Sequence, residues 1–342
     1  MMKKIIVIGN GIASTLFVYF LSQRVKEKIE VLSLADDDLF PRCTLKSTSL
    51  VAKRGAKKGT PLGDLLTNSF DEVESFFSFW KNKYQSIQRV EVTSLCQKGS
   101  KFEEDYLRRF LNQVKDENDF LEFKEWGYLF DAKKILEDLE QEIVSSENIL
   151  WKKEKEAVVR SFFCSEKEKY TLQCLSGKEI EGKYLFFGTN AYSSLLLDYP
   201  LKSEVITGHY LKFQSCNLGD KSFVYNLHEK TFTYRAEENS IEIGVVSTKG
   251  FNASLKEDQL KEIYSLFKPI FSKNIPPLEK GEVLFGYRHK IMGRRPGLFI
   301  DKKVNQSILM ASLGTYKNGF SYNFVLAKEA VDEIMNHWAE VL

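Results

Sequence analysis

Residues 5–16, with the sequence IIVIGNGIASTL, constrain the fold most, because they predict a buried strand that turns directly into a helix. The β-branched run at 5–8 is typical of a central parallel strand covered on both faces. Gly9 and Gly11 leave out the Cβ atoms that would block a tight turn and the approach of a phosphate. The helix that follows directs free N–H groups and its positive dipole end at such a phosphate. The stretch therefore predicts a dinucleotide-binding turn.

Two positions depart from the usual glycine-rich pattern of this turn. Ser14 stands in place of the third glycine of G-x-G-x-x-G and is small enough to allow close packing of helix on strand. Ser33 follows the second predicted strand, residues 29–32, at the place where an acidic residue usually holds the adenosine ribose. The order strand, turn, helix, strand still favours nucleotide binding.

Composition and charge exclude several classes of protein. Lys3 and Lys4 precede an apolar stretch, but glycines interrupt that stretch and no small-residue cleavage site follows, so we expect no signal peptide. No other segment reaches the ~20 apolar residues that cross a bilayer. We therefore expect a soluble, cytoplasmic protein. The net charge of +2 is too small to indicate a nucleic-acid partner by itself.

Cysteine and histidine usage predicts neither a disulfide framework nor a metal site. The five cysteines are odd in number and widely spaced, as expected for free thiols in a reducing compartment. The four histidines show no metal-ligand spacing.

The order of the expected elements predicts an α/β fold (α+β overall) in two domains. Helical patterns occur at 64–84, 103–115, 131–146, 255–268 and 324–338. Short strands are expected at 157–163, 170–175 and 184–187, followed by an antiparallel meander over 206–247. We expect a Rossmann-like nucleotide-binding domain, discontinuous in sequence, at 1–80, 140–205 and 285–342. The substrate-binding domain, with an antiparallel sheet, would comprise 81–139 and 206–284. The C-terminal helix should return to pack beside the N-terminal unit.

The segment at 314–320, with the sequence GTYKNGF, lies between a predicted strand and the last helix and resembles a signature of the glycine oxidase/D-amino-acid oxidase family of flavoproteins. Further matches follow the family's order along nearly the whole chain: Gly9-x-Gly11, Gly188-Thr189-Asn190-Ala191, Gly208, Ile243-Gly244, and Gly286-Tyr287-Arg288 with Pro296. The resemblance implies an FAD-dependent oxidoreductase and makes the first of the two domains the FAD-binding one. No cysteine lies between 280 and 342, so FAD is expected to be non-covalent.

The resemblance also implies which residues hold FAD. The pyrophosphate would lie over the first turn, the adenosine end near the second strand, and the isoalloxazine beside the 314–320 loop. Backbone N–H groups of that loop and the helix after it would stabilise negative charge on reduced flavin. The residues implied in this way are Gly9, Gly11, Ile12, Ala13, Ser14, Ser33, Thr44, Ser47, Thr48, Val158 (or Val159), Gly188, Thr189, Gly314, Lys317, Asn318, Gly319 and Phe320.

Arg288 matches the family arginine that forms a bidentate pair with the substrate carboxylate, a task that suits a planar guanidinium. Such binding presents the substrate Cα to flavin N5, where hydride leaves as the C–N bond becomes an imine. Lys317 is either a residue that tunes flavin charge or a solvated lysine. His289 should point to the opposite face of its strand from Arg288, and we expect no catalytic role for it. Gly293 stands where family members often have an acidic residue, beside Arg294 and Arg295, and this weakens the expectation of amino-acid specificity.

The function expected first is oxidation of the C–N bond of a small amine or amino acid, with reoxidation by oxygen, a quinone or a carrier protein. One alternative is FAD-dependent modification of a tRNA wobble-uridine side chain, in which basic residues would contact phosphates. These are Lys53, Arg54, Lys57, Lys58, Arg294 and Arg295, and a solvated loop explains the first four better. A second alternative is a flavin-binding scaffold without turnover. Tyr210, Tyr225 and Tyr234 line a pocket or, more commonly for such aromatics, belong to the core. The sequence leaves the oligomeric state open.

Overall fold

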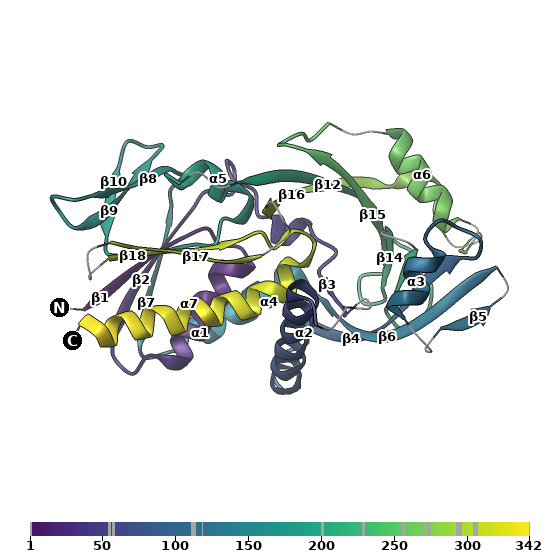
Figure 1. Ribbon diagram of the computed structural model, residues 1–342, viewed down its shortest axis with the longest axis horizontal. Coiled ribbons are helices and arrows are strands. Elements are labelled where there is room, and N and C mark those ends of the chain that lie inside the picture. The colour runs from purple at the N-terminus through teal and green to yellow at the C-terminus, as the bar shows by residue number, and fades with distance from the viewer. Residues whose placement is uncertain are drawn as a thin grey trace. The chain divides into compact units, whose positions relative to one another are not determined.

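The computed structural model (Figure 1) describes residues 2–341 apart from 54–55, 57–58, 111–113, 118, 200–201, 228–229, 255–256, 269, 272–274, 292–295 and 304–306. Contacts group the chain into two compact units. Unit 1 comprises Met1–Leu45, Asp131–Ile206 and Tyr287–Leu342, and unit 2 comprises Lys46–Phe130 and Thr207–Gly286.

A six-stranded sheet forms the centre of unit 1. Its order is β17 (Gly297–Lys303), β18 (Ser307–Leu313), β11 (Tyr184–Phe187), β1 (Lys3–Ile8), β2 (Ile29–Ala35) and β7 (Ile149–Lys155). All neighbours pair in parallel except β17, which lies antiparallel at one edge. Residues 5–8 of β1 are at most 3% exposed, as their β-branched composition predicted for a strand covered on both faces.

The two faces of this sheet are covered by different elements (Figure 1). Three helices, α1 (Ile12–Arg24), α4 (Ala132–Val144) and α7 (Gly319–Val341), pack together on one face, where Phe17 stacks on Phe186 of β11. On the other face, Ile6 and Ile8 belong to a core cluster with residues of a three-stranded sheet. That small sheet consists of β8 (Val158–Cys164), β9 (Lys169–Cys174) and β10 (Glu179–Gly182). The short helix α5 (Ser193–Leu196) packs against β8.

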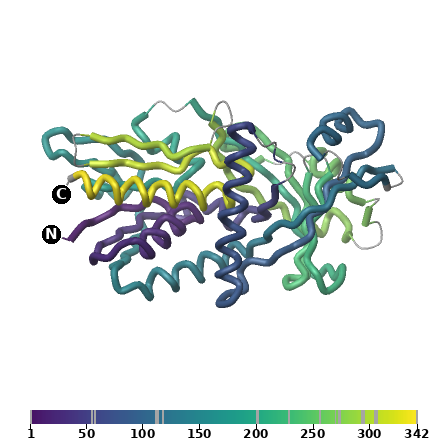
Figure 2. Tube along the Cα trace, turned by 60° about the horizontal axis from the view of Figure 1, so that its bottom comes forward, coloured from purple at the N-terminus to yellow at the C-terminus, as the bar shows by residue number. Residues whose placement is uncertain are grey.

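The final helix returns to the N-terminal unit, which confirms the expectation from the sequence. Figure 2 shows α7 running beside α1, and the Phe20 and Phe324 rings of the two helices meet edge to face. The predicted start of this helix at 324 is wrong, because α7 begins at Gly319.

Unit 2 is built on a nine-stranded sheet. Its order is β16 (Glu282–Ile291), β12 (Ser203–Phe213), β15 (Ser240–Lys249), β14 (Lys230–Arg235), β13 (Phe223–Leu227), β4 (Ile87–Gln97), β6 (Phe120–Phe130) and β3 (Leu50–Val51), with β5 (Lys115–Glu117) paired to β6. The helices are α2 (Pro61–Trp80), α3 (Glu103–Arg109) and α6 (Glu257–Phe267). The meander over 206–247 is confirmed, whereas the helix expected over 103–115 ends at Arg109 and is followed by strand β5.

The contact units differ from the expected domain boundaries in two segments. Residues 46–80 group with unit 2, because β3 pairs with β6 and Tyr128 Oη donates a hydrogen bond to Glu74 of α2 at 3.0 Å. Residues 131–139 group with unit 1, because α4 packs on α1. The assignment of FAD binding to one unit and substrate binding to the other stays a prediction.

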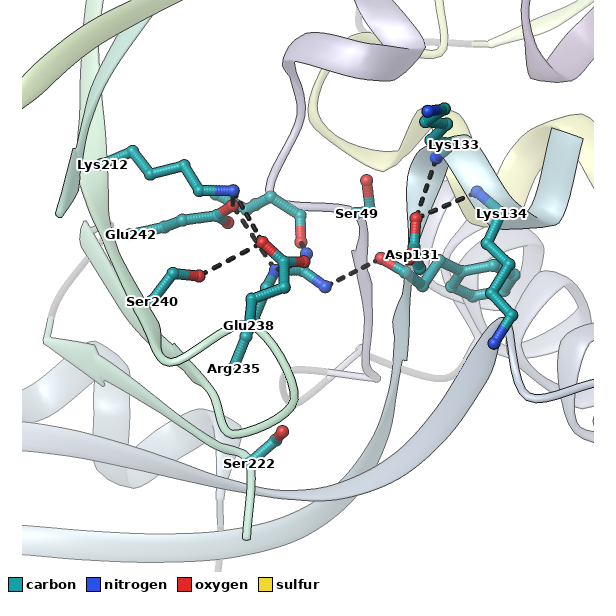
Figure 3. Close-up of polar contacts among 12 residues, drawn as sticks. Ser49, Asp131, Lys133, Lys134, Lys212, Ser222, Arg235, Glu238, Ser240 and Glu242 are labelled. Carbon is teal, nitrogen blue, oxygen red and sulfur yellow. Dashed lines mark hydrogen bonds and ion pairs between the residues drawn. The ribbon is translucent and has the colours of Figure 1, made fainter. Parts of the chain in front are cut away.

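Opposite faces of the unit 2 sheet have different chemistry. Tyr234 belongs to an aromatic core cluster with α6, and the partly buried Tyr225 packs against this cluster, so the core interpretation fits both residues. Arg235, which follows Tyr234 and therefore faces the other way, is buried and donates to the backbone oxygens of Phe130 at 3.0 Å and Thr48 at 2.8 Å (Figure 3). Its Nε lies 3.4 Å from Oε1 of the buried Glu242. This arginine thus ties three distant segments of unit 2 together.

None of the helices in the described part of the chain combines the length and the hydropathy needed to cross a bilayer.

Candidate functional site

The site begins at the turn between β1 and α1. Gly9 has φ +99°, a left-handed conformation that favours glycine, and its N–H donates to Leu34 O of the neighbouring strand at 2.9 Å. Helix α1 begins at Ile12, and its N-cap residue, Gly11, has no side chain that could accept a hydrogen bond from the first turn. The hydroxyl of Thr44 accepts a hydrogen bond from the Ile12 N–H at 3.0 Å. The first turn of α1 therefore presents backbone donors and the positive end of its dipole at this point.

Glycines on two sides of this turn keep it open. A Cβ atom on Gly11 would lie 2.9 Å from Thr44 Oγ1. A Cβ atom on Gly188, at the end of β11, would lie 2.1 Å from Ser14 Oγ and 2.7 Å from Ser14 N. The serine in place of the third glycine therefore fits because Gly188 leaves room for it. We call Gly9, Gly11 and Gly188 the glycine cradle.

A cavity opens over the glycine cradle and brings together many of the residues implied by the family resemblance. The implied residues on its wall come from four separate segments of unit 1. They are Gly9, Gly11, Ile12, Ala13, Thr44, Val158, Gly188 and Thr189. A helix N-terminus beside glycines with no space for side chains suits a phosphate group, so these residues fit the pyrophosphate of a dinucleotide.

Ser33 and Ser14 line a second cavity, which also reaches Gly9. Ser33 is buried, and its hydroxyl accepts a hydrogen bond from Trp151 Nε1 of β7 at 2.8 Å. The Ser33 hydroxyl proton therefore remains available to donate, whereas an acidic residue at this position would only accept. No sequence pattern points to Trp151, because it lies 118 residues from Ser33 along the chain.

The 314–320 loop joins β18 to α7 and is held at both of its first two residues. Gly314 has φ +74°, and a Cβ there would lie 2.9 Å from the Ile291 side chain. The Gly314 N–H donates to Nδ1 of His289 at 3.1 Å. Asn190, on the wall of the first cavity, donates through Nδ2 to the hydroxyl of Thr315. The loop is therefore tied to that wall by a direct side-chain contact.

The remaining loop residues differ in exposure. Asn318 closes a short 3-10 turn, Tyr316–Asn318, and donates through Nδ2 to Tyr322 Oη at 3.2 Å. Gly319 begins α7, and Phe320 is buried at 4% exposure. Lys317 is exposed, with its Nζ 5.7 Å from the Tyr316 ring centre. The loop thus leads into the N-terminus of a 23-residue helix, whose first backbone N–H groups and positive dipole end lie here.

Arg288 lies in β16 and is half-buried, whereas its neighbour His289 is fully buried, in keeping with the alternation of a strand. The preceding residue, Tyr287, contacts the wall of the first cavity, because Cys43 on that wall donates through Sγ to Tyr287 O at 2.6 Å. Burial raises the pKa of the Cys43 thiol to about 11, although the nearby charge of Arg288 acts to lower it. Cys43 is therefore a protonated thiol, and Arg288 lies within electrostatic reach of the cavity wall.

Two of the implied residues group with unit 2, and several of the basic residues lie outside the described part of the chain. Ser47 and Thr48 belong to unit 2, where Ser47 Oγ accepts a hydrogen bond from Ser49 N at 3.1 Å. Lys53 pairs with Asp71 at 2.9 Å, as a solvated lysine would. The positions Arg54, Lys57, Lys58, Gly293, Arg294 and Arg295 lie outside the described residues.

The fold defined by these two units is that of solved oxidases and dehydrogenases. The chain is similar to iminodiacetate oxidase from Chelativorans sp. BNC1 and to glycine oxidase from Geobacillus kaustophilus, each with 13% identity, a TM-score of 0.74 and coverage of 97% of this chain and 95% of the other. It is also similar to L-alpha-glycerophosphate oxidase from Mycoplasma pneumoniae, solved with FAD bound, with 12% identity, a TM-score of 0.71 and coverage of 97% and 94%. No protein-family model and no curated protein sequence matches the chain. The likeness at this identity establishes the fold over both units.

Proposed function

We propose that the protein is an FAD-dependent oxidoreductase that oxidises the C–N bond of a small amine or amino acid, with FAD bound non-covalently. The observation that carries the proposal is the glycine cradle at the N-terminus of α1, with the cavity above it. Among the structures of the same fold, two are named for oxidation of glycine and iminodiacetate, and a third contains FAD. Both lines support a flavoprotein of this kind.

The chain's own residues have separable tasks in this proposal. The N–H groups at the first turn of α1, with Gly9, Gly11 and Thr44, would hold the pyrophosphate. The N-terminus of α7 and the 314–320 loop would supply backbone donors beside the ring system, where they stabilise negative charge. When bound, the flavin supplies a two-electron acceptor. The protein must then orient the substrate, which requires geometry more than a strong base.

Arg288 is the proposed substrate-binding residue. It is half-buried on β16, one residue after the carbonyl that Cys43 contacts on the cavity wall. A guanidinium in that place binds a carboxylate through two parallel hydrogen bonds, whereas a lysine binds it only as a point charge. The proposal therefore favours substrates that carry a carboxylate next to the amine.

The first test is the visible spectrum of the purified protein, followed by denaturation to release its cofactor. Flavin bands with FAD released would support the proposal. A colourless protein that takes up no added FAD would refute it and leave the scaffold alternative.

The second test is anaerobic bleaching of the bound flavin by glycine, iminodiacetate and proline. Arg288→Ala should raise the concentration needed for half-bleaching by roughly 10- to 100-fold, the value of a charged hydrogen-bond pair, and Arg288→Lys should recover part of that loss. Amines without a carboxylate should respond equally to wild type and both variants. Bleaching by none of these amines, together with steeply salt-dependent tRNA binding, would instead favour the RNA-modifying alternative.

A further inference from the structure

A fully buried histidine lies directly behind the 314–320 loop. His289 is 0% exposed, and its Nδ1 accepts the Gly314 N–H at 3.1 Å. The two residues come from different strands of the fold, because His289 lies in β16 and Gly314 directly follows β18. A side-chain acceptor therefore satisfies the first backbone donor of the loop, in a place where an unpaired N–H would be costly.

We propose that His289 is a positioning residue for the 314–320 loop, holding Gly314 so that the backbone donors at the start of α7 face the bound flavin. The inference rests on the proposed function, since it assigns a residue to the same site. His289 acts through Gly314 and contacts neither cofactor nor substrate in this proposal. The proposal gives a positioning role to a side chain for which the sequence pattern predicts no catalytic role.

The hydrogen bond determines the state of the ring. An N–H that donates to Nδ1 requires a free lone pair there, so the single ring proton is on Nε2. Nε2 is buried and has no hydrogen-bond partner among the described residues. Burial also lowers the pKa of His289 to about 4, so the ring is neutral and keeps its acceptor near neutral pH. The neutral Nε2–H tautomer is thus the form that anchors the loop.

Gly314, the anchored residue, lies where a larger side chain would not fit. Gly314 has φ +74°, and an added Cβ would lie 2.9 Å from Ile291 and 3.2 Å from the Pro296 backbone. The next residue, Thr315, is buried and held by Asn190. With two consecutive residues fixed, the direction of the 3-10 turn that follows and of the α7 N-terminus is also fixed.

The test compares His289→Asn with His289→Leu in the full chain. Asparagine offers a side-chain oxygen close to the place of Nδ1, whereas leucine fills the volume without an acceptor. We expect amide hydrogen exchange at Gly314 to become about 10-fold faster in the leucine variant, the value of one buried hydrogen bond. The dissociation constant for added FAD should rise by a similar factor, and the asparagine variant should stay close to wild type in both measurements. Equal exchange and affinity in wild type and the leucine variant would overturn the proposal, as would equal loss in both variants.

If the variants do not fold, a measurement on the unmodified protein tests the hydrogen bond between His289 and Gly314. Ring nitrogen chemical shifts of His289 should show the neutral Nε2–H tautomer at pH 7, and a proton on Nδ1 would overturn the proposal. Failure of the proposed function is distinguishable, because a wild-type protein that binds no FAD can still show the tautomer and the Gly314 protection. In that outcome the anchor would stand and its role toward flavin would be refuted.

Discussion

Replacing Gly188 with alanine tests whether close packing between β11 and α1 builds the cofactor site. The new Cβ would lie 2.1 Å from Ser14 Oγ, 2.7 Å from Ser14 N and 3.1 Å from Ser14 Cα. The hydroxyl can rotate away by giving up its 3.3 Å hydrogen bond to Ile8 O, which costs about 1 kcal/mol. The backbone nitrogen cannot rotate. Strand and helix must therefore separate by about 0.7 Å, the difference between 2.7 Å and the 3.4 Å where ordinary contact begins.

Overpacking of this kind costs about 1–3 kcal/mol, so Gly188→Ala should destabilise the protein by about 2–4 kcal/mol in urea unfolding. The dissociation constant for FAD should rise at least 10-fold, since the first turn of α1 moves with Ser14. Gly297→Ala is the matched control, because a Cβ there meets nothing within 4 Å. Ser14→Ala combined with Gly188→Ala should recover only part of the loss, since the contact with the backbone nitrogen remains. A Gly188→Ala protein with wild-type unfolding and FAD affinity would refute the reasoning.

Three further outcomes follow from contacts described above. Burial holds the pKa of His289 near 4 in the native protein, whereas in the unfolded chain it is about 6.5. Between these pH values the unfolded chain therefore binds a proton at His289 and the native protein does not. Wild type should therefore lose about 3 kcal/mol more stability than His289→Asn between pH 7 and 4, measured by urea unfolding, and equal losses would contradict this. Arg235→Leu should cost about 3–5 kcal/mol, because it removes the charged donor that two backbone carbonyls and the buried Glu242 share. Arg160→Leu, at an exposed and weakly paired site, should cost under about 0.5 kcal/mol, and a similar cost for both variants would count against the buried network. Trp151→Phe and Ser33→Ala should each weaken FAD binding, with a coupling energy of about 1 kcal/mol in the double-mutant cycle, and additive effects would show that their hydrogen bond does not matter for binding.

The β1–turn–α1 unit could be predicted because its signals are local. Burial on both faces selects a β-branched run, and the turn requires glycine, so both appear in adjacent residues. Strand β7 has no such local signal, because its sequence ILWKKEK forms a charged strand at the edge of the sheet, next to β2. Strands β4 and β6 do alternate apolar and polar residues, as at Val90, Glu91 and Val92. They occupy the two gaps between the three helices predicted at 64–84, 103–115 and 131–146, where the sequence analysis predicts no strand.

The parts of the site that are made of backbone groups could be predicted from the sequence. The side-chain contacts between residues far apart in the chain could not. Within the glycine cradle, the spacing of Gly9 and Gly11 predicts the turn by itself, whereas Gly188 is implied only by the family resemblance. The contacts of Ser33 with Trp151, and of His289 with Gly314, join residues 118 and 25 positions apart. Strand alternation predicts that His289 and Arg288 point to opposite faces of β16, in keeping with their different burial. It does not predict that the His289 side chain meets the Gly314 N–H.

The central strand pairing of unit 1 also sets an order on its biosynthesis. Strand β11 needs β18 as a neighbour, and α1 needs α7, yet residues 307–341 are translated after every other segment of the unit. At typical rates of roughly 5–20 residues per second, about 6–24 s pass between synthesis of Phe187 and of Ser307. During that interval an apolar strand edge and one side of α1 have no partner, and such edges pair readily with other chains. Nascent chains of this protein should therefore depend on chaperones until the last helix has emerged.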